Sequence, residues 1–282
     1  MPIPIAHPAA ILPLRRFCPK YLSLSALILG SIAPDLAYSI DDLNQFSRTI
    51  KFIFGKTAAN FQCVRASWEW DDFSHTFLGG LLFCLPLSLA IIGLFRWLRL
   101  DLVEMLPNPH RHALRPLCVQ KHSFRVQVVS LLVGILLHIA WDSFTNGGRW
   151  LGQHWYFLHT ELFTIGTNKI ELYRAFWMIS SFGGTAVLIG AYWHFIKHAG
   201  VDIVINIQAE RRRYLLCTTA LVLPALVAVF PTYVHAQFGA TAGELFNFLH
   251  RFLGNYLICF VVGLLLISLY SKLKPNKPKP QM

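Results

Sequence analysis

Charged residues are scarce in this chain of 282 residues: Asp, Glu, Lys and Arg together make up 14% of it, whereas 55% of the residues are hydrophobic. The mean hydropathy is +0.48. A typical soluble domain carries about 25% charged residues. This scarcity excludes a single soluble domain of ordinary composition, and the division of the apolar residues into long uncharged runs predicts an integral membrane protein.

Closely spaced cysteines are also absent. None of the six cysteines follows another at the short spacing of a thiolate metal site, which excludes a cysteine-based metal clip. Only Cys63 falls in a loop that is predicted to face outward. We therefore expect no structural disulfide and interpret most of the cysteines as small apolar side chains in packed helices.

Acidic residues are few: 14 Asp and Glu stand against 25 Lys and Arg, and the formal net charge is +11. A basic balance is also typical of nucleic-acid-binding proteins. Here the basic residues are spread over four loops without an interleaved aromatic motif, and 17 of the 25 fall in loops on one side of the predicted membrane. The positive-inside rule explains this excess, so we expect no nucleic-acid partner.

Several apolar runs are long enough to cross about 30 Å of hydrocarbon as helices. Five of them cover residues 77–97, 124–141, 173–196, 214–234 and 252–270. A sixth candidate, 21–40, carries Pro34 and Asp35 near its far end, so it either crosses with Asp35 at the interface or dips into the bilayer and returns. We favour crossing. The sequence thus predicts an all-α fold, a polytopic membrane helix bundle of about six transmembrane helices.

The loop charges also predict the topology, with the N- and C-termini in the cytoplasm. We expect one transmembrane helical domain over residues 1–271, with a polar outer insert at 41–74, and a disordered basic tail at 272–282. The spans show no matched pair of Gly or Pro breaks, which argues against an inverted-repeat transporter. A cleaved signal peptide is the alternative interpretation of the N-terminus.

Two ionisable residues interrupt the apolar run SLLVGILLHIAWDSF, which begins at Ser130. His138 and Asp142 are four residues apart and therefore share one helix face. In hydrocarbon such groups are costly unless they pair, bind a metal or line a watery pocket. The pair is therefore a functional-site hypothesis.

Two further residues, Asp35 and His75, lie at predicted span ends on the same side of the membrane as His138 and Asp142. Neutral imidazole nitrogens and carboxylate oxygens are good zinc ligands, and a mixed His and Asp set suits a catalytic site with an open position for water. The pattern predicts a site for a divalent metal, with zinc as the first choice.

Three other residues are candidates for the same site, each with more than one interpretation. Asp71 and Asp72 precede His75 by four and three residues, so either could be a further ligand, an acceptor for the ring N–H or a helix cap. His7 lies in a proline-broken apolar segment that is too short to span. It lies either on the inner side or, if that segment is re-entrant, beside the other candidates.

Three stretches resemble known families: PIAHPAAILPLRRFCPKYLSLSALILGSIAPDLAY, DDFSHTFLGGLLFCLPL and LLHIAWDSFTNGG. Over roughly residues 1 to 200 they resemble a family of bacterial integral membrane proteins known as a domain of unknown function, DUF4184. More distantly, the order His, Pro-Asp, Ser-His-Thr and His-x-x-x-Asp resembles the YdjM-type predicted membrane-bound metal-dependent hydrolases. The motifs are similar again to those of the zinc-dependent phospholipase C group.

The distant resemblance implies a shared metal site. Its ligands would be Asp35, His75, His138 and Asp142, with His7 as a candidate extra ligand. The chain departs from the pattern at Asn146, where a second histidine is expected, and this disfavours a second metal. Ala33 also replaces the glycine that precedes Pro-Asp in the pattern.

We therefore predict a metal-dependent hydrolase of the bacterial inner membrane that acts at the outer face on an ester or phosphoester of a lipid or lipid-linked compound. Asp35 or Asp72 would take a proton during the reaction, and Arg149 could bind a phosphate oxygen. The alternatives are an ion-coupled transporter and a non-enzymatic membrane scaffold locked by buried hydrogen bonds.

Overall fold

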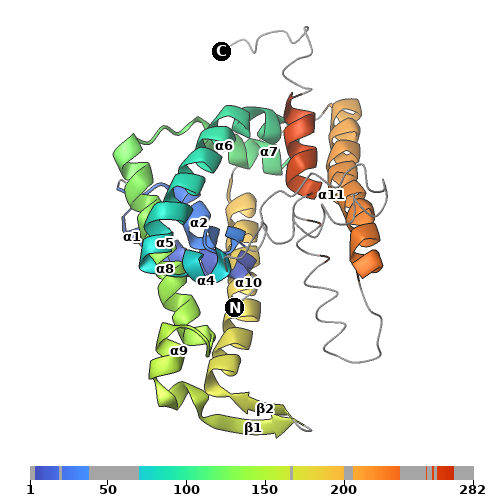
Figure 1. Cartoon of the computed structure of the whole chain (residues 1–282). Coiled ribbons are helices and arrows are strands. Elements are labelled where there is room, and N and C mark those ends of the chain that lie inside the picture. The colour runs from blue at the N-terminus through green and yellow to red at the C-terminus, as the bar shows by residue number, and fades with distance from the viewer. Residues whose placement is uncertain are drawn as a thin grey trace, which may run out of the picture. The chain divides into compact units, whose positions relative to one another are not determined.

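The computed structural model describes residues 4–18, 21–37, 70–165, 168–199, 206–235, 252, 256 and 259–269, most of which are helical (Figure 1). Its elements in chain order are η1 (Pro4–Ile11), α1 (Leu12–Phe17), α2 (Leu24–Ile32), α4 (Trp70–Ser74), α5 (Phe77–Gly79), η3 (Gly80–Cys84), α6 (Leu85–Met105), α7 (His110–Val119), α8 (Phe124–Thr145), α9 (Trp150–His154), η4 (Tyr156–His159), β1 (Glu161–Ile165), β2 (Asn168–Glu171), α10 (Leu172–Lys197) and α11 (Ile207–His235).

Helical stretches long and apolar enough to cross a membrane occur four times in the described part of the chain. They are Phe77–Met105, Phe124–His154, Leu172–Lys197 and Ile207–Val229. They correspond to four of the five predicted spans and confirm a mostly helical membrane protein. The fifth predicted span, 252–270, lies partly outside the described residues, which contain a shorter apolar helix at Cys259–Leu269.

The sixth candidate span, 21–40, contains a shorter helix than expected. Its helix α2 has nine residues, which is a length of about 14 Å against a hydrocarbon core of about 30 Å. The helix ends at a turn over residues 33–35 because Pro34 has no amide hydrogen with which to continue it. Within the described residues this helix alone does not cross a bilayer. Residues 41–69 and the tail 272–282 lie outside the description, so the insert, the tail and the orientation of the termini stay predictions.

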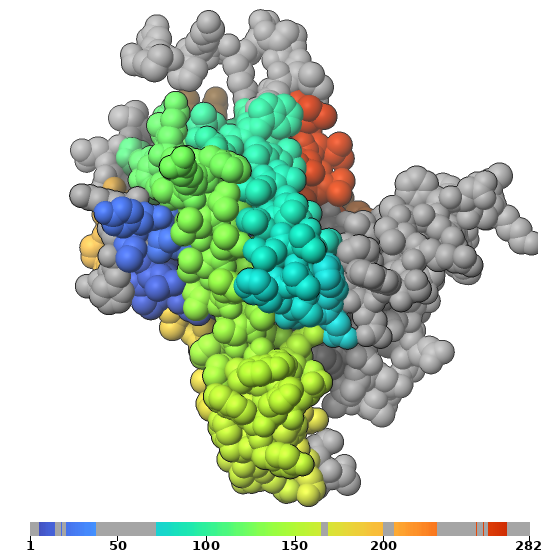
Figure 2. All heavy atoms as spheres, turned by 60° about the vertical axis from the view of Figure 1, so that its left-hand side comes forward, coloured from blue at the N-terminus to red at the C-terminus, as the bar shows by residue number. Residues whose placement is uncertain are grey.

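The chain divides into two compact units, the first of which comprises residues 1–37, 69–94 and 121–198. At its centre, α2 packs along α8. The two helices approach closely because glycines line the contact: a Cβ on Gly134 would lie 2.6 Å from the Leu27 carbonyl oxygen, and one on Gly30 would overlap the carbonyl of Leu131. Figure 2 shows this N-terminal segment (blue) directly against α8 (green). The contact places the end of α2 beside the polar part of α8.

The 3-10 helix η1 packs against both α2 and α10. Near the middle of α10, a Cβ on Gly184 would lie 3.0 Å from the carbonyl oxygen of Ala6, the residue before His7. The N-terminal segment therefore lies at the level of the middle of α10.

A two-stranded hairpin, β1 and β2, leads into α10 (Figure 1). The strands are antiparallel, with Glu161 opposite Glu171 and Ile165 opposite Asn168. The all-α prediction did not include it, because strands this short carry too little alternation of polar and apolar residues to stand out in a sequence.

The second unit comprises residues 38–68, 95–120 and 199–282. In its described part, Glu210 at the start of α11 is 7% exposed. It accepts hydrogen bonds from the backbone N–H of Asn108 at 3.0 Å, from Arg111 at 3.2 Å and from Arg213 at 2.7 Å. A buried carboxylate is costly unless it is paired, so these bonds hold α11 to the turn that precedes α7.

Candidate metal centre

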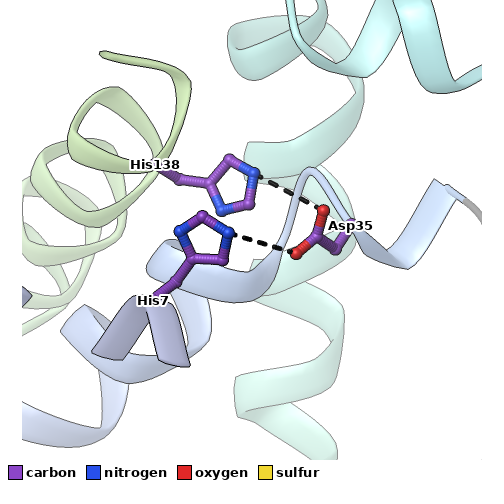
Figure 3. Close-up of side chains that lie close together, drawn as sticks. All are labelled: His7, Asp35 and His138. Atoms are coloured by element: carbon purple, nitrogen blue, oxygen red, sulfur yellow. Dashed lines mark ion pairs between the residues drawn. The ribbon is translucent and has the colours of Figure 1, made fainter. Parts of the chain in front are cut away.

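Five ionisable side chains of the first unit are buried close together. His7 comes from η1, Asp35 from the turn after α2, His75 from the turn between α4 and α5, and His138 and Asp142 from α8. None of them is more than 8% exposed. Figure 3 shows His7 and His138 both pointing at Asp35. Folding thus brings together the five residues that the sequence analysis assigned to a metal.

The packing of α2 on α8 orients the ring of His138. Its Nδ1 lies 2.7 Å from the backbone carbonyl oxygen of Ser31. A carbonyl only accepts hydrogen bonds, so this contact assigns the ring hydrogen to Nδ1, which donates it. The Nε2 lone pair is then left for the other side chains of the cluster.

Ser74 orients His75 in the same way. Its hydroxyl donates to the carbonyl oxygen of Pro34 at 3.0 Å, and its oxygen lies 3.1 Å from Nδ1 of His75. Because the hydroxyl hydrogen is already used, Nδ1 of His75 is the donor and its Nε2 keeps a lone pair. The same hydroxyl holds the turn that carries Asp35, so Ser74 links two of the candidate ligands.

The three donor atoms nearest to one another form a triangle of the size of a metal coordination sphere. Nε2 of His75 and Nε2 of His138 are 3.1 Å apart, and Oδ1 of Asp35 lies 3.7 Å and 3.6 Å from them. The point equidistant from these three atoms is about 2.0 Å from each, which matches zinc–nitrogen and zinc–oxygen bond lengths. The two distances to Asp35 are too long for hydrogen bonds.

His7 adds a donor on the other side of Asp35. Its Nε2 lies 3.7 Å from Oδ2 of Asp35, and its ring centroid lies 4.0 Å from that of His138. His7, Asp35 and His138 offer ligand atoms within 4.8 Å of one another, so they could hold a metal ion. Burial, reinforced by the nearby His138, lowers the pKa of His7 to about 3, which leaves its ring neutral at pH 7. The sequence left two positions open for His7, and in the structure His7 lies beside the other candidate ligands.

Asp142 lies between His75 and Arg149. Its Oδ2 is 4.0 Å from Nε2 of His75 and accepts a hydrogen bond from Nε of Arg149 at 3.2 Å. Its Oδ1 is buried without a hydrogen-bond partner, as are both carboxylate oxygens of Asp35 and Nε2 of His7. Buried polar atoms are normally paired. Four such atoms within one cluster fit a site that binds a cation.

Asp72 does not lie among these donors. Its side chain is 65% exposed, and its Oδ1 accepts a hydrogen bond from Nη1 of Arg149 at 2.6 Å. His75 lies in the turn that follows α4 and is buried, whereas Asp72 lies within α4 on its exposed side. Arg149 therefore joins an exposed carboxylate to the buried one of Asp142. The side chain of Asp71 lies outside the described part of the structure.

Two groups that complete the site did not stand out in the sequence. Ser74 directly precedes His75 in the Ser-His-Thr motif, so its position was a usable signal. Ser31 acts through its backbone carbonyl. Every residue has such a carbonyl, so the residue type does not indicate this role. Both set the tautomer of a histidine rather than offering a ligand atom of their own.

No curated protein and no solved structure matches this chain. The model of one family, described as a domain of unknown function (DUF4184), matches residues 1–272, a range that includes all five buried residues of the cluster. The chain therefore belongs to the DUF4184 family.

Proposed function

We propose that this protein is a metal-dependent hydrolase of the bacterial inner membrane that cleaves an ester or phosphoester of a lipid or lipid-linked substrate at the outer face. One observation carries the proposal: the Nε2 atoms of His75 and His138 face each other at 3.1 Å although both rings donate through Nδ1. Two lone pairs at this distance repel each other unless a cation lies between them.

A metal ion accounts for this arrangement better than a proton. A proton between the two histidines would satisfy one pair of atoms only. A metal ion held by His75 and His138 would also satisfy Oδ1 of Asp35, which has no hydrogen-bond partner. Two imidazoles and one carboxylate with space for a water molecule are a typical catalytic zinc set. His7 and Asp142 are the candidates for further ligands.

The chemistry of hydrolysis follows from this donor set. A divalent metal bound here would lower the pKa of a water molecule and polarise the bond to be cleaved. The predicted proton acceptors are Asp35 and Asp72. Oδ2 of Asp35 is buried, lies outside the triangle and has no hydrogen-bond partner, so it is better positioned to take a proton than Asp72, which pairs with Arg149.

The surroundings of the cluster favour a lipid substrate. Ala33 and Ile135, which are close in sequence to Asp35 and His138, form a buried apolar cluster with Cys84, and α8 and α10 are candidate membrane spans. A substrate dissolved in the bilayer can approach such a site without crossing water. The order of motifs shared with the YdjM-type hydrolases and the zinc-dependent phospholipase C group supports the same chemistry.

The proposal is tested by incubating the purified protein in nanodiscs with a bacterial lipid extract and following cleavage products by mass spectrometry. We expect new products with wild type, and none after chelation or with His138→Ala. His194→Ala is the matched control, because His194 lies near the end of α10 beside His198 and not in the cluster. Equal product formation by wild type and His138→Ala would refute a catalytic role for the cluster.

An ion-coupled carrier is the second candidate, and one observation favours it. The segment that carries His7 lies at the level of the middle of α10, as shown by the contact between Ala6 and Gly184, and carriers bind their ions near the midplane. Such a carrier would move cations or protons across sealed liposomes. A hydrolase would instead retain its metal through purification and support no flux.

A further inference from the structure

Arg149 connects the interior of the site to its surface. The side chain of Arg149 is 12% exposed, and its Nε donates to Asp142, whose side chain is 1% exposed, at 3.2 Å. It also donates from Nη1 to Asp72, which is 65% exposed, at 2.6 Å. One side of this cation therefore faces a buried carboxylate, and the other faces a carboxylate in contact with solvent.

These two contacts differ in how easily they exchange. Breaking a buried ion pair leaves an uncompensated charge and is strongly unfavourable, so the bond to Asp142 fixes the guanidinium in place. An exposed ion pair shifts an equilibrium by a factor of only about one to five. The carboxylate of Asp72 can therefore be displaced by another anion while Arg149 remains in position.

The fixed side of Arg149 reaches toward the donor triangle. Oδ2 of Asp142 lies 3.2 Å from Nε of Arg149 and 4.0 Å from Nε2 of His75. A single carboxylate oxygen thus lies close to both the guanidinium and His75, a histidine of the triangle.

We propose that Arg149 is the subsite for a phosphate group and that Asp72 occupies it when no phosphate is bound. The guanidinium fork matches phosphate oxygens well. The inference deepens the proposed function, on which it rests: it selects a phosphoester over a carboxylic ester as the substrate. It also assigns Asp72 the role of an internal competitor.

The charges of the site agree with this substrate class. Asp35 and Asp142 would balance the charge of a bound divalent ion, and Asp72 pairs with the positive charge of Arg149. A phosphodiester carries one negative charge and can replace Asp72 without changing the total. The headgroup linkage of a phospholipid is such a diester.

The inference is tested by phosphate titration of the detergent-solubilised full chain in a calorimeter. We expect Asp72→Asn to tighten binding of inorganic phosphate about two- to fivefold, the range by which an exposed pair competes. Arg149→Lys keeps the charge but loses the fork, and should weaken binding about tenfold or more. Glu161→Gln is the matched control, because it removes an exposed carboxylate paired with Lys169 at 2.7 Å and should leave the affinity unchanged.

A second arm repeats the titration with the phosphonate analogue of a short-chain phosphatidylglycerol, which cannot be hydrolysed at that bond. Tighter binding of this lipid than of inorganic phosphate identifies a lipid headgroup as the ligand, and equal binding identifies free phosphate. Both results support an anion subsite. Equal shifts by Asp72→Asn and Glu161→Gln, or no tightening by Asp72→Asn, would overturn it.

The metal content of each sample separates this inference from the proposed function. Bound metal together with no effect of Asp72→Asn overturns the phosphate subsite alone. If the chain never binds metal but Asp72→Asn still tightens phosphate binding, the phosphate subsite is supported and the hydrolase proposal is overturned.

Discussion

The Nε2 atoms of His75 and His138 lie 3.1 Å apart, and as neutral rings neither can donate to the other, because each ring donates through Nδ1 to a different acceptor. One acceptor is the Ser74 hydroxyl and the other is the Ser31 carbonyl. Groups that bind no metal themselves therefore decide which nitrogens face the cluster, and through them a turn and a helix end control the proposed chemistry.

Removing a triangle ligand should remove the metal. We expect wild type purified without chelator to carry bound zinc, and His75→Ala or His138→Ala to lose it, because only two donors of the triangle then remain and they hold a divalent ion poorly. His7→Ala should retain metal with weaker affinity, since His7 lies 3.7 Å from the other oxygen of Asp35. Elemental analysis of folded protein measures this. Metal content equal to wild type in His138→Ala would contradict the assigned site.

Ser74→Ala should weaken metal binding without removing a ligand. The variant leaves Nδ1 of His75 and the Pro34 carbonyl without their present partner, and loss of such supporting contacts typically lowers metal affinity about 10- to 100-fold. Chelator competition measures the affinity. Ser74→Thr, which keeps the hydroxyl, should restore it.

Ser143→Ala provides the matched control for this experiment, because the Ser143 hydroxyl bonds within its own helix α8, to the carbonyl of Ile139. A loss of affinity as large as that of Ser74→Ala would show that any buried serine matters equally. The positioning role of Ser74 would then be rejected.

Chelation should lower the thermal stability of the protein by removing the metal from the triangle ligands. A ligand that binds only the folded state stabilises it by about 4 kcal/mol at a thousandfold excess over its Kd. We therefore expect a chelator to lower the Tm of wild type and to leave the Tm of His138→Ala unchanged, which a thermal scan of each in detergent measures. Equal decreases in both proteins would mean that the chelator acts elsewhere.

Gly134→Ala should disturb the site from a distance. Its Cβ would lie 2.6 Å from the Leu27 carbonyl oxygen, so α2 must move away from α8, and overpacking of this kind costs about 1–3 kcal/mol. The Ser31 carbonyl moves with α2, so metal affinity should fall as well. Thermal unfolding and chelator competition measure the two effects.

Gly93→Ala is the control for this helix contact. A Cβ at Gly93 meets nothing within 4 Å, and alanine is favoured over glycine in a helix by about 1 kcal/mol. The free energy of unfolding of Gly93→Ala should therefore equal or exceed that of wild type. If both alanine variants lost stability equally, the close approach of α2 to α8 would not be the cause.

The sequence by itself determined the class of protein and the donor types of the candidate site. Apolar runs of sufficient length must cross hydrocarbon as helices, which identified the four spans within the described residues. His138 and Asp142 stood out because ionisable groups are rare in such runs. These are local properties, set by the composition and spacing of neighbouring residues.

Only the tertiary structure decided which residues meet. Sequence left two positions open for His7 and included Asp72 among the catalytic candidates, whereas the fold brings His7 to Asp35 and pairs Asp72 with Arg149. It also decided the tautomer of His138 through a backbone carbonyl 107 residues away. These outcomes depend on how closely α2 and η1 pack on α8 and α10, and such distances between remote segments are properties of the packed chain that local pattern does not encode.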